Sequence, residues 1–133
     1  MPKSKKKRKK KGHYHRGEYT SLKSGAVYKY RSGWEEKYMS FLDSAPEVSE
    51  WSYEQIAIEY ISNIRTKKIR KYYPDFYVKY SDGHQEVVEV KPKRRLDQAI
   101  IKKKILAAEN WCSLMGMTYK ILTEDGLKIL NLI

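Results

Sequence analysis

The feature that most constrains the fold is residues 73–91, in which apolar and polar side chains alternate on both sides of Asp82-Gly83. Alternation with a period of two is typical of a half-buried strand, and Asp-Gly is a strong turn signal. Residues 73–91 are therefore predicted to form a β-hairpin. Its loop has either two or three residues, and these lengths bring different side chains opposite each other.

The register of this hairpin follows from the rule that opposed side chains in an antiparallel pair point to the same side of the sheet. A two-residue loop would place Phe76 opposite Glu89, with an acid on the core face. A three-residue loop ending at Gly83, in the left-handed region, places Phe76 opposite Val88 and Asp75 opposite Glu89. We predict the second register, which sets two carboxylates side by side on the polar face.

Composition indicates one small domain with a modest core. The chain has 133 residues, 41% of them hydrophobic, and its lone cysteine, Cys112, gives no disulfide framework. No apolar run is long enough to span a bilayer or to serve in a signal peptide, so we expect a soluble protein without a membrane partner. No Gly-rich phosphate loop is present, and the three histidines do not converge with Cys112 on a zinc site. We expect no small-molecule cofactor.

The net charge of +12 is concentrated at the N-terminus. Residues 1–16 hold nine of the 28 lysines and arginines and no acid, whereas the remainder carries 19 basic and 16 acidic side chains. Because like charges this dense repel each other, we predict a disordered basic arm over residues 1–18 and one folded domain over 19–133. The arm is expected to contact nucleic-acid phosphates; a localisation signal, an acidic protein partner and solubility are the alternatives. The residues assigned to DNA binding here are Lys5, Lys6, Lys7, Arg8, Lys9, Lys10 and Lys11.

The N-terminal half of the domain predicts a helix followed by a strand. The helix begins at Ser32, which has capping-box spacing to Glu35, and it ends before Pro46. Residues 50–60 alternate as one half-buried strand, and the basic stretch 65–71 leads into the hairpin.

The C-terminal part predicts a helix, a short strand and a last helix. Residues 97–115 form the first helix, which ends at Gly116; residues 118–122 form the strand, and Thr123 opens the last helix. The element order α-β-β-β-α-β-α indicates an α/β fold, a mixed sheet with helices on its faces. The side chains of helix 97–115 expected to face the sheet are Ile101, Ile105, Ala108, Trp111 or Cys112, and Met115.

These motifs resemble the PD-(D/E)xK nuclease superfamily, which has a restriction-endonuclease-like αβββαβ core. Pro74-Asp75 lies on the second strand of this core and Glu89-Val90-Lys91 on the third. More narrowly, the chain is similar to the TnsA-like endonucleases, which include the endonuclease subunits of heteromeric transposases and the head completion nucleases of T-even-like tailed phages. Its small size and lysine-rich start resemble the phage branch. The resemblance covers roughly residues 28–122, and its motifs are Tyr30–Glu35, Glu50–Ser52, Pro74–Phe76 and Glu89–Lys93.

The resemblance implies a metal-dependent DNA endonuclease that hydrolyses phosphodiester bonds with one or two Mg²⁺ or Mn²⁺ ions. Asp75 would be the central ligand, Glu89 the second and the Val90 backbone carbonyl a third, since hard cations take oxygen ligands. Transposase members often have Gln at the position of Glu89, which leaves the second acid open. Lys91 would orient the attacking water or stabilise charge on the phosphate. Glu35 would support the metal directly or through water, or act only as the partner in the helix cap.

Each residue also has a structural explanation. Asp75 could be a strand-entry residue, and Glu89 with Lys91 could form an exposed polar face. Two opposed carboxylates are destabilising unless a cation lies between them, which favours the catalytic interpretation. Basic residues that follow the site are expected to contact backbone phosphates, although a solvated helix face also explains the last of them. They are Lys93, Arg94, Arg95 and Lys102.

The leading hypothesis is therefore a nuclease that acts in phage head completion or DNA packaging. The resemblance places it in the host cytoplasm during assembly, or with the virion, with phage head or portal proteins as further partners. One alternative is a non-catalytic DNA-binding virion assembly protein, which would tolerate the loss of Asp75 or Lys91. Another is a branched-DNA resolvase, which would prefer four-way junctions to linear duplex.

Overall fold

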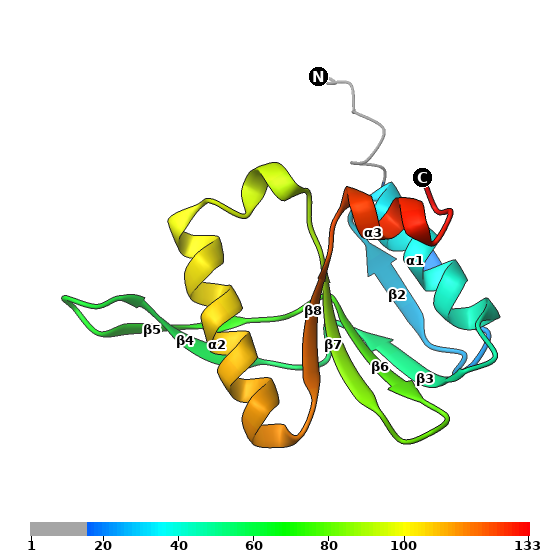
Figure 1. Ribbon diagram of the computed structural model, residues 1–133, viewed down its shortest axis with the longest axis horizontal. Coiled ribbons are helices and arrows are strands. Elements are labelled where there is room, and N and C mark those ends of the chain that lie inside the picture. The colour runs from blue at the N-terminus through cyan, green and yellow to red at the C-terminus, as the bar shows by residue number, and fades with distance from the viewer. Residues whose placement is uncertain (1–15) are drawn as a thin grey trace, which may run out of the picture.

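In the computed structural model, which describes residues 16–133, four strands form a central mixed sheet in the order β3-β6-β7-β8 (Figure 1). The first three strands pair antiparallel, and β8 is parallel to β7. Together with α1 before β3 and α2 before β8, they form the predicted αβββαβ core. The strands are β3 (Val48–Tyr53), β6 (Phe76–Tyr80), β7 (Gln85–Val90) and β8 (Thr118–Leu122).

The β6–β7 hairpin has the predicted register. Phe76 pairs with Val88, and the Tyr80 N–H donates to the His84 carbonyl at 2.8 Å across a three-residue loop. Gly83 in this loop has a φ of +94°, a conformation that costs glycine little. The prediction is confirmed, and the same register places Asp75 opposite Glu89 at the end of the pair.

Residues 50–60 do not form one strand, as the alternation had indicated. β3 ends at Tyr53, Glu54 takes a φ of +56°, and the chain leaves the sheet before β4 (Ile58–Asn63) begins. β4 pairs with β5 (Lys68–Tyr72) in a separate two-stranded sheet. The basic stretch 65–71, expected as a link, therefore supplies a turn and most of a strand. Alternation has the same period in one strand and in two successive strands, so it could not reveal the break.

The predicted caps of the helices are confirmed. α1 (Gly33–Ser44) starts after Ser32, whose hydroxyl accepts the Glu35 N–H at 3.2 Å. α2 (Ala99–Met115) follows a short 3-10 turn, η3 (Lys93–Arg95), and ends at Gly116 with a φ of +72°. α3 (Glu124–Ile129) is the terminal helix. No described helix has the length and apolar character needed to cross a membrane.

α2 covers one face of the sheet through Ile101, Ala108 and Cys112, all buried as predicted. Met115 was expected to face the sheet, but it is 53% exposed. It is the last residue of α2, next to the C-cap Gly116.

The opposite face of the sheet is covered by α1, α3 and a hairpin that the sequence did not reveal, β1 (Gly17–Thr20) with β2 (Val27–Tyr30) (Figure 1). The first described strand thus begins at Gly17, and residues 1–15, which include most of the predicted arm, lie outside the described part of the chain.

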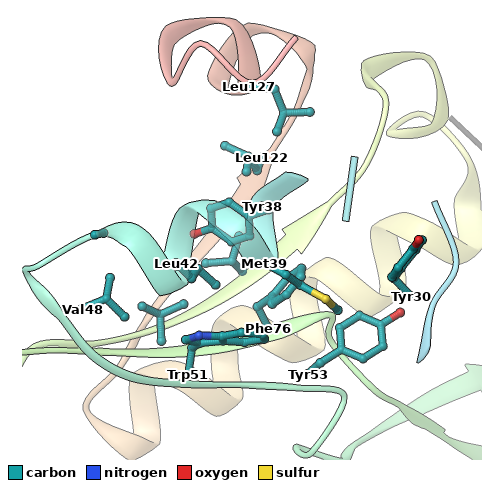
Figure 2. Close-up of a cluster of buried hydrophobic side chains, with 13 residues drawn as sticks. Tyr30, Tyr38, Met39, Leu42, Val48, Trp51, Tyr53, Phe76, Leu122 and Leu127 are labelled. Atoms are coloured by element: carbon teal, nitrogen blue, oxygen red, sulfur yellow. The ribbon is translucent and has the colours of Figure 1, made fainter. Parts of the chain in front are cut away.

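Aromatic side chains fill the core on the α1 side of the sheet (Figure 2). Tyr38 meets Phe76 edge-on at a centroid distance of 5.0 Å, and Tyr53 meets the same ring at 5.3 Å. Such edge-to-face contacts add to the free energy of burial and orient each ring. They hold α1 and β3 against the start of β6, directly beside Asp75.

Candidate active site

A pocket of about 250 Å³ lies where α1 begins, β6 begins and β7 ends. Its lining includes all five residues to which the sequence assigned catalysis or metal binding: Glu35, Asp75, Glu89, Val90 and Lys91. The structure thus brings together residues from three elements that are separate in the sequence. The other lining residues are Arg16, Arg31, Ser32, Trp34, Pro92 and Arg95.

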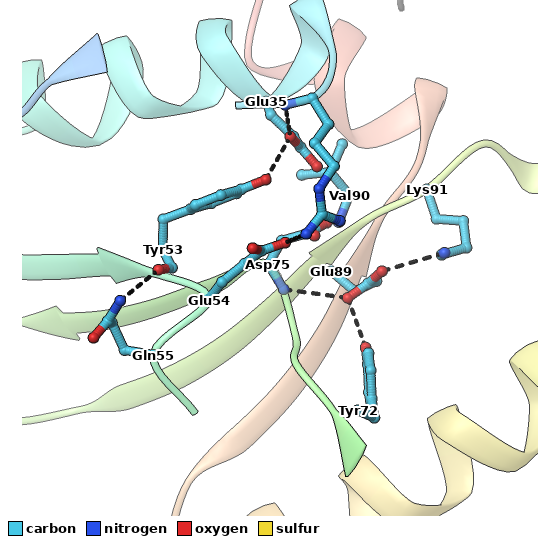
Figure 3. A network of polar contacts seen from close by, with 10 residues as sticks. Glu35, Tyr53, Glu54, Gln55, Tyr72, Asp75, Glu89, Val90 and Lys91 are labelled. Atoms are coloured by element: carbon cyan, nitrogen blue, oxygen red, sulfur yellow. Dashed lines mark hydrogen bonds and ion pairs between the residues drawn. The ribbon is translucent and has the colours of Figure 1, made fainter. Parts of the chain in front are cut away.

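Asp75 and Glu89 are held beside each other by backbone hydrogen bonds (Figure 3). The Asp75 N–H donates to Glu89 Oε1 at 3.3 Å, and the Val90 N–H donates to Asp75 Oδ2 at 2.8 Å. Continuing the hairpin register would pair Val90 with Pro74, which has no N–H to donate to the Val90 carbonyl. The proline therefore ends the ladder and leaves that carbonyl without its usual strand partner.

The three acids carry an excess of buried negative charge. Asp75 is 5% exposed, and Glu35 and Glu89 are 7% exposed. Burial, followed by the charges of Glu89 and Glu35, raises the pKa of Asp75 well above its ordinary value of 3.8. The opposing effects of the Val90 N–H and Lys91 do not outweigh these causes. A cation in this pocket would relieve the repulsion.

Glu89 is bonded on both of its oxygens. Oε2 forms an ion pair with Lys91 Nζ at 3.2 Å, and Oε1 accepts the Tyr72 hydroxyl at 2.6 Å. The Tyr72 hydroxyl also lies 3.0 Å from that of Tyr119. Sequence reasoning found Glu89 and Lys91 but missed both tyrosines, because no local pattern links β5 or β8 to this carboxylate.

Glu35 serves the helix cap and also lines the pocket. Its Oε1 accepts the Arg31 N–H at 2.8 Å and the Tyr53 hydroxyl at 2.9 Å, while its own N–H donates to Ser32. In a standard capping box the carboxylate would accept the N–H of the cap residue itself. Here it accepts the N–H of the preceding residue and lines the same pocket as Asp75, so the two interpretations of Glu35 are compatible.

Comparison with known proteins identifies the family of this chain. Residues 45–124 match the family of TnsA-like endonuclease N-terminal domains. The chain belongs to this family. It is 32% identical over 124 residues to the head completion nuclease of Enterobacteria phage T4, and the alignment covers 77% of this chain and 82% of that protein. The resemblance stated from the motifs is confirmed, and this TnsA-like endonuclease is a nuclease with a restriction-endonuclease-like fold.

An ion pair missed by sequence reasoning borders the pocket of this TnsA-like endonuclease. Arg31 Nη2 lies 2.6 Å from Glu54 Oε2, although the Arg31 side chain remains 60% exposed. Burial raises the pKa of Glu54 against the opposing charge of Arg31. Arg31 lies in the motif before α1, so its position was visible in the sequence; Glu54 was not, because it acquires its place from the break after β3.

The basic residues expected to bind phosphates differ in their surroundings. Arg95 lines the pocket, whereas Lys93 is paired with Asp125 at 2.9 Å. Arg94 and Lys102 are exposed and form no ion pair with another residue in the range 16–133. Residues 5–11 lie outside the described part of the chain.

The donor set fits a hard divalent cation only if the backbone takes part. Within residues 16–133, no three Asp, Glu, His or Cys side chains are close enough together to hold one ion between them. If an ion binds in this pocket, Asp75 and Glu89 would supply two carboxylates, and the Val90 carbonyl, which Pro74 leaves without a strand partner, would be a third oxygen ligand. Carboxylate and carbonyl oxygens are the ligands that Mg²⁺ and Mn²⁺ prefer.

Proposed function

We propose that this TnsA-like endonuclease hydrolyses DNA phosphodiester bonds with a divalent metal, at a site made by Asp75, Glu89 and Lys91. The observation that carries the proposal is the group of three buried carboxylates around one pocket, where burial and the charges of Glu89 and Glu35 raise the pKa of Asp75. A merely structural site has no reason to incur this repulsion. By the name of its T4 relative, we further propose that it acts in phage head completion, in the host cytoplasm or with the virion, with head or portal proteins as partners.

The residues that would hold Mg²⁺ or Mn²⁺ are Asp75, Glu89 and the Val90 carbonyl, and Glu35, which lines the same pocket, would support the ion directly or through water. Such an ion lowers the pKa of bound water and polarises a phosphoryl oxygen. The choice between one and two ions stays open in this proposal.

The remaining residues of the pocket act on the substrate. Lys91 is held by Glu89 at 3.2 Å, so its ammonium is fixed at the pocket wall, where it can orient the nucleophile or stabilise phosphoryl charge. Arg16 and Arg95 also line the pocket. Guanidinium matches phosphate geometry, so we assign these two residues to positioning the DNA strand.

The test is a cleavage assay on supercoiled and linear DNA with Mg²⁺, Mn²⁺ or EDTA. The proteins are the wild type, Asp75→Asn, Lys91→Ala and the matched control Glu109→Gln, which changes an exposed acid on α2. Wild type and control should cleave only with metal, and both site variants should lose about 100-fold or more. Mg²⁺ should also raise the melting temperature of the wild type, because it binds the folded state, but not that of Asp75→Asn.

Equal background cleavage in all four proteins, with DNA binding retained, would contradict the proposal and favour a non-catalytic DNA-binding assembly protein. Cleavage of four-way junctions in strong preference to linear duplex would instead identify a resolvase.

A further inference from the structure

The strands β4 and β5 form a two-stranded ribbon, residues 58–72, that projects away from the central sheet (Figure 1). From Asn63 to Lys71 every residue is exposed on a strand or turn that no other element covers. A projecting ribbon of this kind buries little surface of its own, so its outer part contributes little to the core.

Charge is distributed unevenly over the folded domain, and the ribbon is one of two positive segments. The ribbon has five basic side chains and one acidic side chain. The other positive segment, residues 91–104, has seven basic side chains and one acidic side chain. Residues 17–133 hold 19 basic and 16 acidic side chains, so the rest of the domain retains seven basic and 14 acidic ones. The positive charge of the domain therefore lies in two segments, which the packing of α2 on β4 brings together. The basic residues of the ribbon are Arg65, Lys67, Lys68, Arg70 and Lys71.

None of these five side chains forms an ion pair with another residue in the range 16–133. Their charges are exposed and available to a partner. Lys71 is directly opposite Glu59 in the register, so its charge is the most nearly balanced of the five.

The tip of the ribbon is ordered in a way that presents charge. The Asn63 side chain accepts the N–H groups of Arg65 at 3.0 Å and Thr66 at 3.2 Å, which closes the turn. Lys67 follows with a φ of +58°, a conformation that glycine or asparagine adopts with less strain. A lysine at this position therefore costs some local stability.

The base of the ribbon is anchored beside the candidate active site. Ile58, Tyr60 and Tyr72 are buried with Ala108 of α2, and Lys103 donates to the Ser62 carbonyl at 2.9 Å. The last residue of the ribbon, Tyr72, donates to Glu89. The ribbon thus ends beside the Glu89 carboxylate, at the edge of the candidate active site.

We propose that the ribbon is an arm that binds the phosphate backbone of duplex DNA next to the cleaved bond, through Arg65, Lys67, Lys68 and Arg70. This proposal deepens the function proposed above and rests on it for the substrate. Each strand has five or six residues, which corresponds to about 17–20 Å. Because one turn of B-DNA is about 34 Å, the tip would reach phosphates roughly half a turn from the active site.

The test compares two triple variants of the full chain by binding to a labelled duplex in EDTA, where cleavage does not occur. The ribbon variant is Lys67→Gln, Lys68→Gln and Arg70→Gln. The control variant is Lys29→Gln, Lys37→Gln and Lys128→Gln, three exposed lysines elsewhere, so that net charge is matched. In a plot of log affinity against log salt concentration, each phosphate contact makes the slope steeper by about 0.9. Between 50 and 200 mM salt, the control should therefore lose about 40-fold more affinity than the ribbon variant.

A single substitution tests the same arm without any risk to folding. Lys67→Gly relieves the strained conformation, so the variant should melt no lower than the wild type. It also removes one charge, so the slope of log affinity against log salt concentration should become shallower by about 0.9. Lys67→Arg keeps the charge and should leave the slope unchanged. In cleavage assays the ribbon variant should show a raised KM at nearly constant kcat, since no ribbon lysine lies in the catalytic pocket.

Equal affinity and equal salt slopes in the ribbon and control variants would overturn the proposal. So would loss of self-association or of binding to a protein partner in the ribbon variant with DNA binding unchanged, because the ribbon would then be a protein interface. Binding in EDTA is independent of catalysis. If no protein cleaved DNA but the slopes differed as expected, the arm would stand and the proposed hydrolysis would fail.

Discussion

The hydroxyl of Tyr72 lies 2.6 Å from Oε1 of Glu89 and donates a hydrogen bond to it. Tyr72 ends β5 and Glu89 is on β7, so the bond joins the ribbon to the candidate active site. Burial and the charge of Glu89 raise the pKa of Tyr72 far above its ordinary value of 10, so the phenol stays protonated and donates at neutral pH.

Tyr72→Phe should reduce cleavage by about 10- to 150-fold, because loss of a hydrogen bond to a charged group costs about 1.5–3 kcal/mol. The metal concentration for half-maximal rate should rise as Glu89 becomes less well oriented. Single-turnover cleavage across a Mg²⁺ titration measures both. Tyr73→Phe alters an exposed neighbour and serves as the control. An unchanged metal requirement in Tyr72→Phe would show that the tyrosine only packs.

Asp75→Asn should abolish cleavage and yet stabilise the metal-free protein. The wild-type carboxylate is buried between Glu35 and Glu89, whereas a neutral amide of the same shape avoids that repulsion and can still accept the Val90 N–H. We expect a gain of at least about 1 kcal/mol in the free energy of unfolding, because burying a polar group without compensation costs about 1–3 kcal/mol. Chemical denaturation in EDTA measures it. A less stable variant would mean that the acid contributes to folding rather than to metal binding.

Asp43 should make stability depend on acid pH. Burial raises its pKa, but hydrogen bonds from the Leu22 N–H, the Trp51 indole and the Tyr19 hydroxyl outweigh burial, and the pKa is lowered below 3.8. A lowered folded pKa stabilises the protein above the unfolded value of about 3.9, and this contribution is lost as pH falls through the folded value.

Asp43→Asn should therefore lower the free energy of unfolding by about 1–3 kcal/mol at pH 7, and by progressively less below pH 4. Denaturation curves at several pH values measure the difference from wild type. Asp97→Asn, at an exposed acid, should show neither effect. If the stability lost in Asp43→Asn stays constant down to pH 2, the shape of the Asp43 side chain and not its charge would be what stabilises the fold.

Gly83→Ala should lower the free energy of unfolding by about 1–2 kcal/mol. An added Cβ would meet no atom within 4 Å, so the cost comes from the backbone φ of +94° alone. Gly83→Asn should cost less, because asparagine tolerates positive φ. Thermal melting ranks the three proteins, and the folded variants should keep the wild-type kcat. Equal stability of alanine and glycine would show that the loop can adopt another turn.

Much of the fold was predictable where the pattern is local. The hairpin register followed from Phe76, Val88 and a glycine turn, and helix ends followed from Ser32 and Gly116, because caps and turns involve residues close in sequence. The hairpin β1–β2 was missed because its two four-residue strands are too short for alternation to stand out. The break at Glu54 was missed because strand pairing, not periodicity, decides where a strand ends.

For the candidate site, the sequence alone determined which acids and which lysine lie at the end of one hairpin, since side-chain parity in paired strands is a local rule. Only the tertiary structure decided that Asp75 is buried, that Glu35 approaches it from α1, and that Tyr72 holds Glu89. Alternation specifies which face a side chain takes but not what covers that face. Burial, and with it the raised pKa of Asp75, depends on elements that are distant in the chain and meet only when the whole domain packs.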